Sequence, residues 1–182
     1  MTDYLTTGSK IHLTPLSPKK EQIKIEDIAH ALSFMTRANG QFPEFYSVGQ
    51  HSIHCMEEAQ ARGYSKRVQL ACLLHDGSEA YMADIIRPIK KHLPGYLEIE
   101  AGLQGTIYEK YLDTPLTEEE MAQVKSVDDN LLYHEFYHYM GEALFEEEPV
   151  LKSNPAFITE EFKTVEKRFL EKFHTLQAKI EI

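Results

Sequence analysis

Apolar side chains recur at steps of three and four residues along most of this chain, the spacing of one buried face of a helix. Between residues 25 and 35 this stripe consists of Ile25, Ile28, Ala29, Leu32 and Met35. Capping residues mark the starts of later segments, namely Ser47 with Gln50, Ser65 alone, and Thr117 with Glu120. The pattern predicts an all-α bundle and excludes a large sheet.

Helices are expected over residues 25–35, 48–63, 66–81, 94–112, 118–140 and 160–177. Pro88 and Pro94 interrupt the segment after Asp84, which predicts a loop holding a single helical turn. Residues 10–14 and 22–25 alternate weakly, and this favours a small N-terminal β-hairpin. A chain of 182 residues suits one domain, which we place over 1–182.

Charge and cysteine content restrict the partners and the compartment. The chain has 19 basic and 29 acidic residues, a formal charge of −10 that opposes binding to a nucleic-acid polymer but leaves a small anion open. Cys55 and Cys72 form no C-x-x-C pair, which is typical of a reduced, cytoplasmic protein. No signal-peptide pattern and no apolar run of about 20 residues is present, so neither secretion nor a membrane partner is expected.

Ionisable residues interrupt the most apolar predicted helix, in the stretch LLHDGSEAYMAD. His75 and Asp76 directly follow an apolar run, and burying such a pair costs several kcal/mol unless a metal or partner compensates. The alternative is a core histidine hydrogen-bonded to a neighbouring helix, with Asp76 at a helix end.

Two further residues favour the metal. His51 lies in the first turn of one predicted helix, and Asp128 follows apolar positions on another. With His75 and Asp76 they supply two imidazoles and two carboxylates from three helices, a donor set that suits manganese, cobalt, iron, nickel or zinc. Four protein ligands leave coordination positions open to water.

The pattern H…HD…D resembles that of HD-domain metal-dependent phosphohydrolases. The sequence around these residues strengthens the resemblance. The runs IEDIAHALSFMTRANGQFPEFYSVGQHS, LLHDGSEAYMADIIRPIKKHLPGY and VKSVDDNLLYHE resemble bacterial HD proteins related to the 5′-deoxynucleotidases, including prophage-encoded relatives. The resemblance covers most of residues 25–135, with the core motifs inside 25–140. It implies an HD-domain helical bundle.

Roles for individual residues follow from this resemblance. One divalent metal is expected on His51, His75, Asp76 and Asp128, with Asp129 as the adjacent alternative to Asp128. Glu79 matches the acidic residue beside the metal-bound water, and Asp84 matches a further acidic position that either binds a sugar hydroxyl or protonates the leaving oxygen. Arg37 matches an arginine that contacts substrate phosphate. Lys90 is a candidate second phosphate cation from its position after Pro88, and the alternative is a solvated loop lysine.

The expected activity is removal of phosphate from deoxynucleoside 5′-monophosphates by attack of metal-bound hydroxide. The same centre would serve a phosphodiesterase or a pyrophosphohydrolase of signalling nucleotides, and a non-catalytic nucleotide-binding regulator is the alternative from another class. A complete ligand set together with Glu79 favours an enzyme. The resemblance also suggests a homodimer.

His134, Glu135 and His138 have the spacing H-E-x-x-H of zinc peptidases. If Asp128 points inward, helical steps put Glu135 near the same face and the two histidines about 120° and 80° away from it. A peptidase would also need a third ligand, for which Glu160 or Glu161 has the plausible spacing, and a supporting sheet, which this mostly helical chain hardly offers. The spacing is therefore a weak indication.

Overall fold

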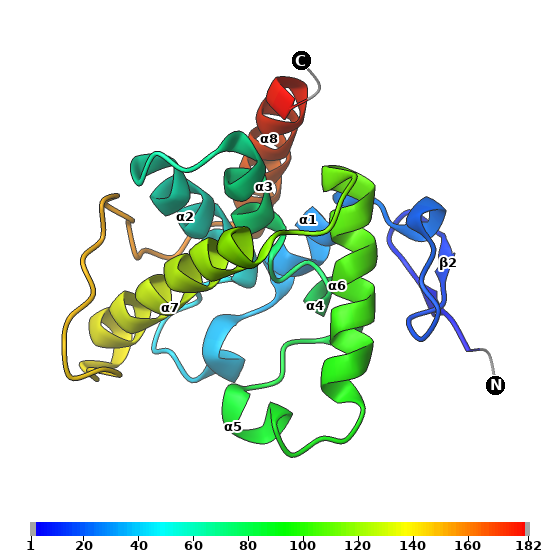
Figure 1. The fold of residues 1–182 in the computed structure, drawn as a ribbon. Coiled ribbons are helices and arrows are strands. Elements are labelled where there is room, and N and C mark those ends of the chain that lie inside the picture. The colour runs from blue at the N-terminus through cyan, green and yellow to red at the C-terminus, as the bar shows by residue number, and fades with distance from the viewer. Residues whose placement is uncertain (1–2, 181–182) are drawn as a thin grey trace.

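The computed structural model of this protein describes residues 3–180. These residues form an all-α bundle with a small N-terminal hairpin, as the sequence predicted (Figure 1). None of the helices described is both long and apolar enough to span a bilayer.

The long helices agree with the predicted segments within a few residues at most ends. They are α1 (Ile25–Phe34), α2 (Val48–Ala61), α3 (Lys66–Leu74), α6 (Tyr96–Leu112), α7 (Glu118–Met140) and α8 (Phe162–Ile180). Shorter elements are α4 (Glu79–Met82), α5 (Arg87–Lys90) and the 3₁₀ turns η1 (Lys20–Gln22) and η2 (Arg37–Gly40). The single turn predicted between the two prolines is α5.

Helix α3 is at the centre of the bundle. Its five consecutive residues from Leu70 to Leu74 are fully buried, and the helix contacts α2, α6, α7 and α8. Burial on every side explains why its apolar residues show no single stripe. Because His75 and Asp76 follow directly, the chain leaves the core at the point where the ionisable residues begin.

The predicted helix over 66–81 is wrong in its continuity. Helix α3 ends at Leu74, residues 75–78 form a turn, and α4 begins at Glu79. A Cβ atom at Gly77 would lie 2.9 Å from the carbonyl oxygen of Leu74 and 3.2 Å from the side chain of Ile107. Glycine is therefore needed where the turn passes α6, and the turn separates His75 and Asp76 from the helical ladder.

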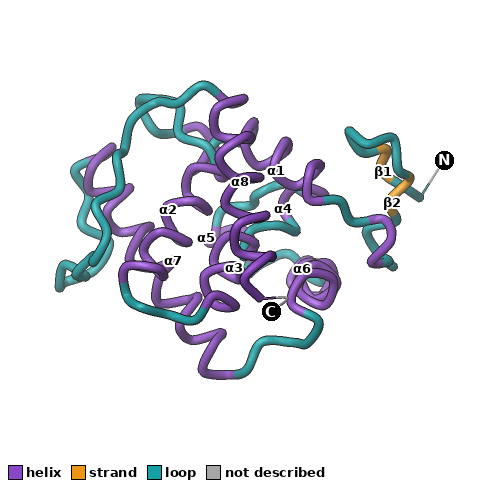
Figure 2. Tube along the Cα trace, turned by 90° about the horizontal axis from the view of Figure 1, so that it is seen from above, coloured by secondary structure: helices purple, strands orange, loops and turns teal. Residues whose placement is uncertain are grey.

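The hairpin pairs β1 (Leu5–Thr6) with β2 (His12–Leu13) in antiparallel register. The expected strand at 22–25 is wrong, because η1 ends at Gln22 and α1 begins at Ile25. Residues 12–13 pair with the preceding segment 5–6, and not with residues 22–25 as expected. Figure 2 shows the hairpin on the side of the bundle opposite α2 and α7.

Residues 141–161, which we call the strap, connect α7 to α8 without a helix or strand. Glu58 of α2 is fully buried and accepts hydrogen bonds from the backbone N–H groups of Lys152 at 3.0 Å and Ser153 at 2.7 Å. The Ser153 hydroxyl donates to the same carboxylate at 2.6 Å. One buried carboxylate therefore fixes the middle of the strap to the bundle.

Candidate metal centre

The start of α2 determines where His51 points. Ser47 Oγ accepts a hydrogen bond from the Gln50 backbone N–H at 3.1 Å, and Gln50 Oε1 accepts one from the Ser47 N–H at 3.2 Å. This reciprocal capping box confirms the predicted helix start. With the helix start fixed, His51 faces the interior and is fully buried.

Four side chains from three regions of the chain meet at one point. His51 Nε2 lies 3.2 Å from His75 Nε2 and 3.2 Å from Asp128 Oδ1. Asp76 completes the group, with Oδ1 3.3 Å from His75 Nε2 and Oδ2 3.8 Å from His51 Nε2. His75 Nε2 also lies 3.7 Å from Asp128 Oδ1. The structure thus brings together all four predicted ligands.

These separations fit a single ion. Nitrogen and oxygen donors bind zinc at about 2.0–2.2 Å, so adjacent donors lie about 2.8–3.1 Å apart in an octahedral centre and about 3.3–3.6 Å apart in a tetrahedral one. The shortest separations here are 3.2, 3.2 and 3.3 Å. The shortest separations are therefore those expected of donors that share one ion.

The outer nitrogen of each imidazole is already engaged. His75 Nδ1 donates to the carbonyl oxygen of Cys72 at 2.8 Å, and His51 Nδ1 lies 2.5 Å from Glu135 Oε1. Occupied Nδ1 atoms leave both Nε2 atoms as the ligating nitrogens and fix the orientation of the rings. Hydrogen bonds at Nδ1 thus orient both rings, as is usual for histidines that bind a metal through Nε2.

Glu135 is a fully buried carboxylate at the back of the site. Besides His51, it accepts hydrogen bonds from the Tyr46 hydroxyl at 3.0 Å and from Arg37 Nη2 at 3.3 Å. Burial raises the pKa of this carboxyl, but His51, Arg37 and Tyr46 outweigh burial and lower the pKa to about 2. Glu135 is therefore an anion throughout the neutral range.

Asp128 is held as an anion in a similar way. Burial raises the pKa of its carboxyl, but the hydrogen bonds with His51 and His75 outweigh that effect and keep the pKa well below its ordinary value. In the protein without metal, protons on the imidazoles neutralise the group. A divalent cation would replace those protons, as binding to histidine requires.

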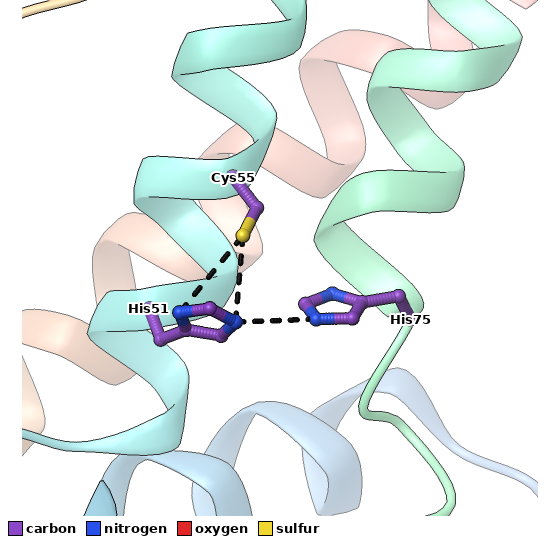
Figure 3. Close-up of side chains that lie close together, drawn as sticks. All are labelled: His51, Cys55 and His75. Atoms are coloured by element: carbon purple, nitrogen blue, oxygen red, sulfur yellow. Dashed lines mark hydrogen bonds between the residues drawn. The ribbon is translucent and has the colours of Figure 1, made fainter. Parts of the chain in front are cut away.

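A second donor set shares the two imidazoles. His51, Cys55 and His75 lie close enough together to hold a metal ion, and Cys55 Sγ is 3.4 Å from His51 Nε2 (Figure 3). Burial raises the pKa of the Cys55 thiol to about 11, so the thiolate needed for ligation is costly to form. Asp76 and Asp128 are the more available donors, and we assign Cys55 to packing beside His51.

The H-E-x-x-H residues diverge. His134 Nε2 donates to the carbonyl oxygen of Pro149 at 2.6 Å, and the His138 ring packs 5.3 Å from the Phe157 ring. Glu135 instead faces His51 from the interior. The three side chains therefore form no zinc site within residues 3–180, and the helical-face argument for Glu135 is correct.

A cavity of about 450 Å³ adjoins two of the four candidate ligands, Asp76 and Asp128. All four residues predicted to act on substrate line it, and they are Arg37, Glu79, Asp84 and Lys90. Asp76 and Asp128 lie in the same lining, so the metal ligands border the cavity. Its apolar wall consists of Phe42, Ile85, Ile86, Pro88, Leu132, Phe136, Leu144 and Phe145, and the last two come from the strap.

Glu79 is the most unusual acid of this cavity. It is 5% exposed, and its Oε2 atom has no hydrogen-bond partner among the described residues. Burial first, and then the negative charges of Asp76 and Asp84, raise the pKa of this carboxyl well above its ordinary value. Glu79 therefore retains a proton at a pH where ordinary carboxyls have lost theirs.

Arg37 and Lys90 contribute positive charge to the lining. Arg37 is buried, and its two terminal nitrogens lie 3.5 Å from Asp76 Oδ2 and 3.3 Å from Glu135 Oε2. Lys90 Nζ lies 2.7 Å from Glu100 Oε1 and 3.9 Å from Glu79 Oε1. Both predicted cations thus lie at the cavity, although each already faces carboxylates.

The structure also adds residues that sequence reasoning missed. Arg87 lines the cavity and contacts both Asp128 and Asp129. Asp129 is paired with Arg87 and with Lys125, whereas its neighbour Asp128 faces the imidazoles. The choice of Asp128 over Asp129 therefore agrees with the geometry. No local signal in the sequence indicated that Arg87 contacts these two aspartates.

Comparison with known proteins identifies relatives but no activity. No family model matches the chain. It is 38% identical over 113 residues to "Uncharacterized protein RCAP_rcc00048" of Rhodobacter capsulatus, which covers 59% of this chain and 56% of that protein. It is 35% identical over 108 residues to "Uncharacterized protein YfdR" of Escherichia coli K12, covering 59% and 58%. The matches thus span less than two thirds of these curated relatives.

Proposed function

We propose that this chain is a divalent-metal-dependent phosphohydrolase of the HD type that removes phosphate from deoxynucleoside 5′-monophosphates. The observation that carries the proposal is the convergence of His51, His75, Asp76 and Asp128 beside a cavity of small-molecule size. The resemblance of the sequence to HD phosphohydrolases supports the reaction class.

The donor set suits manganese, cobalt, iron, nickel or zinc, because it mixes imidazole nitrogen with carboxylate oxygen. Such a metal would supply Lewis acidity that activates water near neutral pH and screens the charge of the phosphoryl oxygens. His51 and His75 would hold it through Nε2, and Asp76 and Asp128 through their carboxylates.

Arg37 binds the phosphate in this proposal. A guanidinium has five N–H donors in one plane, and its contacts with Asp76 and Glu135 at 3.5 and 3.3 Å are long. A phosphate in the cavity would offer shorter, charge-assisted bonds to the same plane. Lys90, which lines the cavity and contacts Glu100, is the second phosphate cation.

Glu79 moves the proton at its Oε2 atom. An acid or base is most effective when its pKa lies near the working pH, and burial shifts Glu79 in that direction. Oε2 has no partner to satisfy among the described residues, so it can bond to water or to the leaving oxygen. Asp84, on the same lining, then accepts a hydrogen bond from a sugar hydroxyl.

The apolar wall accounts for the rest of the substrate. Phe42 and Phe136 meet edge to face at 5.1 Å, and together with Phe145 they offer aromatic surface to a base. A free nucleotide suits this cavity better than a nucleic-acid polymer, because the formal charge of the chain is −10.

Phosphate release tests the proposal. Metal-stripped protein would be reloaded with manganese, cobalt, nickel or zinc and given deoxynucleoside and ribonucleoside monophosphates, beside an Asp76→Ala control. We expect release that requires metal and is absent from the control.

Diesters and nucleoside polyphosphates complete the panel. Turnover of these substrates alone would replace the monophosphatase with a phosphodiesterase or pyrophosphohydrolase. Tight nucleotide binding without turnover by any metal form would support a regulator instead.

A further inference from the structure

Arg87 connects the cavity wall to α7. It is the first residue of α5, and its guanidinium reaches 41 residues along the chain to Asp128. Nη2 donates to Asp128 Oδ2 at 2.7 Å, and Nη1 donates to Asp129 Oδ1 at 3.0 Å. The planar fork thus bridges two successive carboxylates, which a lysine ammonium cannot do with the same geometry.

The two oxygens of Asp128 consequently have different partners. Oδ1 faces the imidazoles, 3.2 Å from His51 Nε2 and 3.7 Å from His75 Nε2. Oδ2 is held by Arg87 on the other side. As long as Arg87 holds Oδ2, the carboxylate plane is fixed and only Oδ1 is directed at the centre.

We propose that Arg87 is a positioning residue of the metal centre, which orients Asp128 for ligation through Oδ1 alone. The inference rests on the proposed metal site, because it concerns how one of its ligands is held. Hydrogen-bonded partners of metal ligands commonly contribute to affinity by fixing ligand geometry.

The same contact fastens α5. Arg87 ties this short helix to α7, while Lys90 at its other end ties it to Glu100 of α6 at 2.7 Å. Figure 1 shows α5 as a short turn near the start of α6. Because both Arg87 and Lys90 line the cavity, the wall and the ligand Asp128 belong to one connected network.

The sign of the effect separates positioning from simple charge. Removing a positive charge beside a cation site should strengthen metal binding if only long-range electrostatics acted. Loss of orientation at Asp128 should instead weaken it. The Arg87 side chain is 56% exposed, so its removal leaves the core intact.

Lys125 provides a matched control. Lys125 has the same charge as Arg87, and its Nζ lies 2.5 Å from Oδ2 of Asp129, one turn further along α7. Within the described residues its ion pair is with Asp129 and not with Asp128. Lys125→Ala therefore removes a nearby positive charge without touching the ligand.

The experiment is a zinc and manganese titration of the metal-stripped full chain against a competing chelator. Arg87→Ala should weaken metal affinity about 10- to 100-fold, Arg87→Lys less, and Lys125→Ala not at all. Arg87→Gln, which removes the charge and the guanidinium but keeps part of the aliphatic stem and a polar end, repeats the test if the alanine variant loses helicity by circular dichroism.

Each contrary result has its own meaning. Unchanged or tighter binding by both Arg87→Ala and Arg87→Gln would overturn the positioning role and leave the metal centre standing. Equal weakening by Lys125→Ala would also overturn it, since the loss of affinity would then not depend on a contact with Asp128. A wild-type chain that binds neither metal would overturn the metal centre, and the role of Arg87 with it.

Discussion

Nδ1 of His51 lies 2.5 Å from Oε1 of Glu135, and both side chains are fully buried. Glu135 and Asp128 lie on the same face of α7. This helix therefore supplies one candidate ligand, Asp128, and the hydrogen-bond partner of another, His51. Both side chains of α7 thus contact His51, one at each ring nitrogen.

Replacing Glu135 should weaken both the fold and the metal site. In Glu135→Gln the anion opposite His51 and Arg37 is lost, and breaking such a buried pair costs about 3–5 kcal/mol. Urea unfolding of the metal-free protein would measure this loss, and a metal titration would measure the weaker affinity. Glu142→Gln, at an exposed carboxylate just beyond α7, is the control and should change neither.

The pKa of Glu135 predicts how stability depends on pH. Its folded pKa of about 2 lies below the unfolded value, so its contribution is complete above the unfolded pKa and is lost as the pH falls toward 2. Metal-free wild type should therefore lose stability between about pH 5 and pH 2 more steeply than Glu135→Gln. Parallel curves for the two proteins would contradict the assignment of this carboxyl as a buried anion.

Asp128 and Asp129 offer a comparison of adjacent carboxylates. Asp128→Ala should abolish metal binding in a titration, because Oδ1 is one of four converging donors. Asp129→Ala should retain it, since that carboxylate is engaged by Arg87 and Lys125. The reverse order of affinities would assign the ligand to Asp129.

Glu79→Gln should separate metal binding from turnover. Its carboxyl lines the cavity but is not among the four converging ligands, so metal affinity should be retained. Loss of proton transfer should lower kcat about 10²- to 10⁴-fold, with a flattened limb in the pH–rate profile. Glu98→Gln, an exposed position on α6, is the matched control. Near-normal kcat in Glu79→Gln would remove this residue from the chemistry.

Local signals explain why the helices were predictable. The capping boxes at Ser47 and Thr117 are contained within four residues each, and both are present in the structure. Glu135 was also within reach of the sequence, because seven residues on a helix return to the face of Asp128. Such features depend on neighbours along the chain and need no knowledge of the fold.

Other features depend on contacts that no local pattern contains. The apolar run continues to Leu74, where the helix ends, and the turn that follows passes close to Ile107 of α6 at Gly77, a contact that the sequence does not reveal. The pairing of Arg87 with Asp128 spans 41 residues and requires the docking of α5 near α7. Tertiary packing, rather than propensity, decides both.

The cavity is lined partly by residues of the helical core and partly by residues of the strap. The four candidate ligands and Glu135 are on or beside helices of the core, whereas Leu144 and Phe145 come from a segment without regular structure that Glu58 anchors in its middle. Connecting segments tolerate insertions and substitutions better than packed helices do. Substitutions in the strap would therefore change the wall of the cavity and leave the four converging side chains in place.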